Sequence, residues 1–180
     1  MPDRIIRFAD LPVSRWRNGL GRKADIIGGE GWGLSFAWMD CDAPFSDYSG
    51  QDRTLTLLEG RGFTLEFAGH PPLVVDRPHR PTRFDGDWPA RCVLAGTPCL
   101  VVNIIAERAR WRQSVDILPV VGEVALTPLG GPCHAVVLDG EVTLPDGVVA
   151  TRHDTVPVPG RLVLHGQGAR LALAQLQPVG

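Results

Sequence analysis

Two arginines, Arg53 and Arg108, are candidates for binding the carboxylate of a ligand. Arg53 follows the turn-rich block from Pro44 to Gly50 and precedes the strand-like stretch from Thr54 to Leu58. A guanidinium at the start of a strand can hold both oxygens of a carboxylate through two parallel hydrogen bonds. Each arginine, Arg53 and the later Arg108, could equally pair with a neighbouring aspartate. We expect Arg53 to anchor an anionic ligand, and Arg108 is the second candidate.

Polar residues in apolar surroundings are the next candidates for ligand binding. Asn103 interrupts the run from Leu100 to Ile105, and its burial without a partner would cost about 1–3 kcal/mol. Asn103 must therefore bond either a neighbouring loop or a ligand, and the sequence does not decide between them. Ser35 alternates with apolar neighbours and is expected to face the interior. Further contacts are expected from two loop segments, in which Trp16 could equally be a core residue: Trp16, Asn18, Phe45 and Ser46.

The histidines do not have the spacing of a metal site built on a strand. Ligands on one face of a strand lie two residues apart, because side chains alternate between faces. The five histidines are at positions 70, 79, 134, 153 and 165, and no two of them are two apart. Only the last three could converge. We therefore expect no metal and no cofactor, and no local Ser-His-Asp or Cys-His signature suggests a catalytic nucleophile.

Composition excludes several classes of partner. The net charge is −2 and 44% of the residues are hydrophobic, which is typical of a globular protein without a basic surface for nucleic acid. No run approaches the roughly 18 apolar residues of a membrane span. The four cysteines include no CxxC pair and fit a reducing compartment. We expect a cytoplasmic protein that binds neither nucleic acid nor membrane, and homodimerisation stays open.

Short strands between turns dominate the chain. The 21 glycines and 16 prolines leave few windows long enough for a helix. Phe63 to Phe67 alternates strictly between apolar and polar residues, and Leu100 to Ile105 is typical of a buried strand. Residues 107 to 114 permit one or two helical turns. The pattern therefore predicts an all-β fold.

A strand, an acidic-Gly turn and a second strand occur twice. Leu57-Leu58-Glu59-Gly60 precedes Phe63-Thr64-Leu65, and Val137-Leu138-Asp139-Gly140 precedes Val142-Thr143-Leu144. This order, followed by a Pro-rich crossing and a returning strand, is typical of a cupin barrel. We predict an internal duplication in which segments 54–67 and 135–144 are equivalent hairpins. The expected fold is a bicupin, with two RmlC-like jelly-roll lobes over residues 1–110 and 111–180 packed as one globule.

Several motifs, taken in order, resemble those of the HutD/Ves family of bicupins. The resemblance covers most of residues 5 to 110 and rests on these segments: Trp16-Arg17-Asn18-Gly19-Leu20-Gly21, Trp32 to Ala37, Pro44 to Arg53, Leu57 to Gly60, Phe84 to Asp87, and Asn103 with Arg108. The chain departs from the family pattern at Leu20, Arg22, Lys23 and Val101. The resemblance implies a protein of histidine utilisation that binds a pathway metabolite and moderates that pathway.

The expected function is therefore the binding of a small acidic metabolite of histidine or amino-acid catabolism. Two alternatives remain at this stage. One is a metal-independent cupin enzyme that acts as an isomerase or hydrolase on a small acid. The other is a structural or interaction protein whose barrel is filled by its own side chains.

Overall fold

The computed structural model describes residues 5–16 and 19–180, and nearly every regular element in them is a β-strand. The chain divides into two compact units, described separately below: residues 12–110, and residues 111–180 together with the first eleven residues. Residues 5–11 thus belong to the second unit, whereas the expected lobe boundary placed them in the first. No helix of the described residues is long and apolar enough to cross a membrane.

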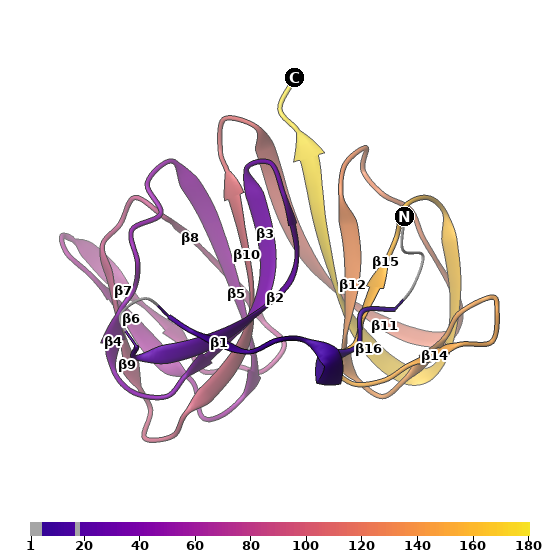
Figure 1. Cartoon of the computed structure of the whole chain (residues 1–180), viewed down its shortest axis with the longest axis horizontal. Coiled ribbons are helices and arrows are strands. Elements are labelled where there is room, and N and C mark those ends of the chain that lie inside the picture. The colour runs from indigo at the N-terminus through magenta and orange to yellow at the C-terminus, as the bar shows by residue number, and fades with distance from the viewer. Residues whose placement is uncertain (1–4, 17–18) are drawn as a thin grey trace. The chain divides into compact units, whose positions relative to one another are not determined.

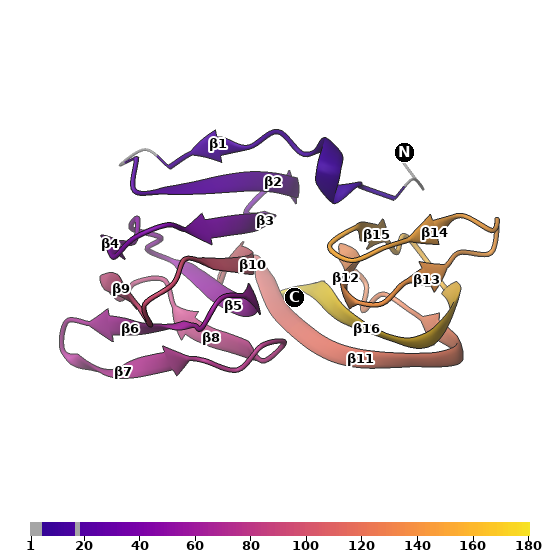
Figure 2. The same ribbon diagram turned by 90° about the horizontal axis from the view of Figure 1, so that it is seen from below.

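The unit of residues 12–110 contains two antiparallel sheets. The larger has the order β1-β2-β3-β10-β5-β8, and its strands are Ser14–Arg15, Gly21–Gly29, Trp32–Met39, Cys99–Glu107, Gln51–Glu59 and Pro81–Asp85. The smaller has the order β4-β9-β6-β7, with strands Ala43–Pro44, Ala90–Leu94, Phe63–Phe67 and His70–Val75. Figure 2 shows β2 and β3 on one side of this unit and β6 and β7 on the other.

The core of this unit confirms the alternation predicted for Phe63 to Phe67. Phe63, Leu65 and Phe67 are buried, whereas Thr64 is half-buried and Glu66 is exposed. The three apolar side chains pack in one hydrophobic cluster with others such as Leu55 and Val101. Alternate residues of β6 therefore close the interior from the side of the smaller sheet.

The second unit is built around one long pair of strands. β11 (Trp111–Leu126) and β16 (Leu162–Pro178) run antiparallel over their whole lengths and are seen side by side in Figures 1 and 2. The other strands join β16 in the order β14-β13-β16-β12-β15: Val149–Ala150, Val142–Thr143, Cys133–Asp139 and Thr155–Pro157 for β14, β13, β12 and β15. The short 3-10 turn η1 covers Phe8–Asp10.

The helical turns permitted over residues 107–114 are not formed. Glu107 ends β10, a turn follows, and Trp111 begins β11. The reason is non-local: the first residues of β11 are paired with the end of β16, from Trp111 with Pro178 to Ser114 with Gln175, and this pairing overrides the weak local preference for helix.

The predicted duplication is present in the strand neighbours, but the predicted hairpins are wrong. β5 and β6 are not bonded to each other, nor are β12 and β13. The equivalence is instead one of neighbours. β5 lies between β10 and β8, and β12 lies between β16 and β15 in the same way. Likewise, β6 lies between β9 and β7, and β13 lies between β16 and β14. The long β16 thus takes the place of both β9 and β10.

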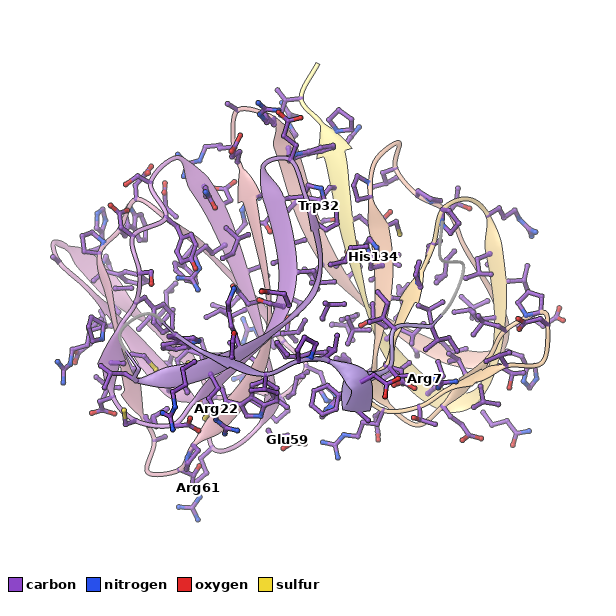
Figure 3. All side chains as sticks on the ribbon, viewed as in Figure 1. Arg7, Arg22, Trp32, Glu59, Arg61 and His134 are labelled. Carbon is purple, nitrogen blue, oxygen red and sulfur yellow. The ribbon has the colours of Figure 1, made fainter. Side chains whose placement is uncertain are left out.

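Asp154 binds Arg7 and Phe8 to the rest of the second unit. Its carboxylate, in a residue only 4% exposed, accepts hydrogen bonds from the Phe8 backbone N–H at 3.0 Å, the Thr151 backbone N–H at 3.0 Å and the Thr151 hydroxyl at 3.1 Å. It also pairs with Arg7 at 2.7 Å, which Figure 3 labels near η1. Burial acts to raise the pKa of Asp154, but these donors outweigh it and lower the pKa below 3.8.

Replacing Asp154 should reveal this linkage through pH. A carboxyl whose pKa is depressed by folding stabilises the protein above its ordinary pKa, and this stabilisation is lost as the pH falls through the lowered value. We expect Asp154→Asn to reduce the free energy of unfolding by about 1.5–3 kcal/mol at pH 7. Urea denaturation should show the difference shrinking below about pH 4, whereas a difference that is constant from pH 7 to pH 3 would contradict the assignment.

Arg108 binds together three acidic residues near one end of the larger sheet. Its Nε donates to Asp52 Oδ1 at 3.0 Å, Nη2 to Asp85 Oδ1 at 2.5 Å and Nη1 to Asp87 Oδ2 at 2.9 Å. Asp52 also pairs with Arg83. Asp52 and Asp85 belong to β5 and β8, and Arg108 follows β10, so the cluster connects the ends of three neighbouring strands.

Removing Arg108 should therefore loosen this end of the sheet. Three carboxylates would be left close together without their shared cation, and we expect Arg108→Ala to lower the free energy of unfolding by about 1–2 kcal/mol. The matched control is Arg112→Ala at an exposed position of β11, which should change stability by less than about 0.5 kcal/mol. Equal urea midpoints for the two variants would show that the cluster contributes nothing specific.

Candidate functional site

A cavity of about 740 Å³ lies within the unit of residues 12–110. Alternate residues of neighbouring strands line it, as expected where every second side chain of a strand points to the same face. They include Ser35, Ala37 and Met39 of β3; Val101, Asn103 and Ile105 of β10; and Arg53 and Leu55 of β5. A volume of this size is typical of ligand pockets and does not fit a barrel filled by its own side chains.

Arg53 is the charged group buried in this cavity. The residue is 7% exposed, and its Nε has no hydrogen-bond partner. No ion pair among the described residues includes Arg53. Its sequence neighbour Asp52 is bound instead by Arg83 and Arg108. A buried cation without a counter-ion is costly in a protein interior, so this arrangement calls for an anion.

Three aromatic rings surround the Arg53 guanidinium. Its central carbon lies 4.8 Å from the ring centre of Phe45, 4.6 Å from that of Tyr48 and 5.1 Å from that of Phe84. Such contacts offset part of the cost of burying the charge. Burial lowers the pKa of Arg53 to about 10, with an opposing contribution from Tyr48. The group therefore keeps its positive charge at neutral pH.

The segment that supplies two of these rings is fixed at both ends. The Phe45 N–H donates to the Ala90 carbonyl at 2.8 Å, and the Gly50 N–H donates to Asp87 at 2.5 Å. The Arg108 backbone N–H donates to the Gly50 carbonyl at 3.0 Å. Arg108 itself does not line the cavity. The structure thus places it among aspartates, the alternative kept open above, where it supports the segment that contacts Arg53.

Asn103 and Ser35 face each other across neighbouring strands. The register pairs Asn103 of β10 with Ser35 of β3 and with Leu55 of β5. Asn103 is 6% exposed, and its Oδ1 is buried without a hydrogen-bond partner. No loop satisfies this amide oxygen among the described residues. The structural alternative for Asn103 is therefore weaker than the ligand-binding one.

The aromatic wall of the cavity includes Trp16 and Phe45, whose ring centres are 6.0 Å apart in an edge-to-face arrangement. Gly21 allows Trp16 to lie there, because a Cβ at position 21 would be 2.7 Å from the Trp16 ring. Ser46 also lines the cavity. The expected contact Asn18 lies outside the described residues.

Several lining residues were not expected from the sequence. The cavity is also lined by Tyr48 beside Arg53, by Lys23 and Asp25 of β2, and by Trp32 at the start of β3. Phe84 contacts the Arg53 guanidinium but is not one of the lining residues. Trp32 is labelled in Figure 3. Alternation along residues 21–29 would have placed Lys23 and Asp25 on one face of a strand. Phe84 approaches Arg53 because β5 pairs with β8, and no local pattern in the sequence predicts this pairing.

Among the described residues that line this cavity there is no histidine and no cysteine. No three His, Cys, Asp or Glu side chains within residues 5–16 and 19–180 are arranged to hold a metal ion. Burial lowers the pKa of His134 to about 4, which keeps its imidazole neutral. The pKa of Cys92 is raised to about 12, mainly by burial, and burial raises the pKa of Cys133 to about 12 as well. These two thiols are therefore not nucleophilic thiolates.

The chain is similar to proteins of known family and fold. An uncharacterized 21.2 kDa protein in the hutC 3′ region of Pseudomonas putida is 31% identical over 121 residues, which is 62% of each chain. HutD from Pseudomonas fluorescens SBW25 has a TM-score of 0.84 at 24% identity, covering 98% of this chain and 99% of that one. A cupin 2 conserved barrel domain protein from Leptotrichia buccalis has a TM-score of 0.64 at 11% identity, covering 92% and 89%.

These likenesses confirm the predicted fold class and the resemblance seen in the motifs. At such low identity the two solved structures show the fold alone, which is an all-β, cupin-like one. The match to the Pseudomonas putida relative spans less than two thirds of that protein. The HutD family model, in contrast, matches residues 8–160. Because that match covers most of the sequence, the chain belongs to the HutD family.

Proposed function

We propose that this chain binds a small acidic metabolite of histidine or amino-acid catabolism and thereby moderates that pathway. The observation that carries the proposal is the buried guanidinium of Arg53, which has no carboxylate partner among the residues that the structure describes. The association with histidine utilisation is supported by the names of two similar proteins, HutD and a protein of the hutC region.

The geometry favours a planar anion over a neutral ligand. The rings of Phe45, Tyr48 and Phe84 occupy positions around the guanidinium carbon, which restricts the rotamers of Arg53 without using its N–H donors. A carboxylate can accept two of those donors at once. Removal of water from the cavity on binding would strengthen the charged hydrogen bonds, because the local dielectric constant falls.

The polar and apolar surroundings agree with a small ligand. Ser35 and Asn103 offer uncharged hydrogen-bonding groups, while Trp16 and Phe45 offer flat apolar surface. Pockets for small molecules are generally apolar with a few well-placed polar groups. One buried charged anchor and two neutral polar groups beside apolar side chains therefore support selective binding of an organic acid.

Removing the anchor should abolish most of the affinity. Arg53→Ala should weaken binding of a carboxylate ligand by about 2–4 kcal/mol, as for other buried charge pairs. The ligands to test by calorimetry are the carboxylate intermediates of histidine degradation, each compared with its uncharged amide. Arg53→Lys keeps the charge but loses the planar fork, so it should recover only part of the affinity.

Two results would contradict the proposal. One is wild-type affinity in the Arg53→Ala variant while the exposed control Arg112→Ala also binds normally. The other is equal affinity for a carboxylate and its amide, since a neutral amide cannot replace the charge. Far-ultraviolet circular dichroism of each variant should match the wild type, so that lost binding is not lost folding.

A further inference from the structure

A row of polar side chains crosses the cavity from Arg53 toward β2. The register places Asn103 opposite Ser35, and Ser35 opposite Asp25. Arg53 lies on β5, opposite Ile105 and two positions along from the partner of Asn103. All four of these polar residues line the same cavity. A single carboxylate at Arg53 would leave most of this row, and most of the 740 Å³, without a ligand group.

The far end of the row is an ion pair on β2. Lys23 Nζ donates to both carboxylate oxygens of Asp25, at 3.0 Å and 2.9 Å. The two residues are two apart on one strand and therefore share a face. Their side chains are 45% and 67% exposed. Exposed ion pairs contribute little net stability, so each partner can exchange the other for a ligand group at small cost.

The chemical complement of this pair is a group that carries both charges. A ligand carboxylate alone could take Lys23, but it would leave Asp25 without its cation and close to a second negative charge. A ligand that also has an ammonium group satisfies both, with its carboxylate on Lys23 and its ammonium on Asp25. The α-amino acid headgroup has these two charges on groups that are bonded to the same carbon atom.

The distance across the sheet suits a short ligand chain. Three inter-strand steps lead from β2 through β3 and β10 to β5, about 14 Å at roughly 4.8 Å per step. The registers place Lys23 level with Leu57, four residues along β5 from Arg53, so the backbones of Lys23 and Arg53 are about 19 Å apart along the diagonal. Lys23 and Arg53 have long side chains that shorten this span from both ends. The space between their charged groups suits a short aliphatic chain that passes Ser35 and Asn103.

We infer that Lys23 and Asp25 form a second, zwitterion-binding end of the cavity, and that the ligand is an amino acid with an acidic side chain. The side-chain carboxylate meets Arg53 and the α-amino acid headgroup meets the ion pair. This inference rests on the proposed function, because it assumes that Arg53 binds a carboxylate. It adds a class of ligand that Arg53 alone does not select.

Calorimetry on the full chain can test this with matched ligands. L-glutamate and glutarate share a carbon skeleton and differ by the ammonium group, as do L-α-aminoadipate and adipate, which are one methylene longer. At least one amino acid should bind the wild type about tenfold more tightly than its partner without the ammonium group. In Asp25→Asn this advantage should fall to less than about threefold, while Glu123→Gln, an exposed acid of β11, should preserve it.

The outcomes separate the two proposals. If glutarate and adipate bind as tightly as the amino acids, and Arg53→Ala weakens all four, the zwitterion-binding end is wrong and the carboxylate anchor stands. If the ammonium advantage survives in Asp25→Asn, the inference is also wrong. If none of the four binds, or if Arg53→Ala changes nothing, the anchor fails and the inference fails with it.

Discussion

The burial of one unpaired guanidinium is the constraint on which the candidate site depends. Arg53 is held inside an apolar unit without a counter-ion among the described residues, and burial alone would expel or neutralise such a charge. Three aromatic rings offset part of the cost. The adjacent acid, Asp52, is occupied by two other arginines. A bound anion could supply the missing counter-charge, and this is the physical basis of the proposed function.

The sheet places the other polar groups through its two-residue alternation. Ser35 and Asn103 are opposite each other in register, so their side chains point to the same face of the sheet, the one that lines the cavity. An apolar side chain at either position would avoid the free-energy cost of burying a polar group. Outside the cavity, Arg108 joins the ends of β5 and β8 and holds the segment before β5. The charged residues therefore have separate roles: the exposed cluster around Arg108 joins the strand ends, and the buried Arg53 lines the cavity.

The sequence indicated those features that depend on local order. The inward position of Arg53 could be predicted because the residue lies between a turn block and a strand. That of Asn103 could be predicted because the residue interrupts an apolar run. The contacts of Arg108 could not, because its three aspartates come from segments brought together only by strand pairing. The supposed hairpins failed for the same reason: a turn between two strands does not determine whether they pair with each other or with later strands.

Stability without ligand tests the unpaired charge most directly. Methionine has a similar length and no charge, so Arg53→Met removes the buried cation while keeping the volume filled. We expect its free energy of unfolding, measured by urea denaturation in the absence of ligand, to exceed that of the wild type by about 1–3 kcal/mol, as when buried charges are replaced by apolar groups. If Arg53→Met is less stable than the wild type, Arg53 is a structural residue and the cavity does not require an anion.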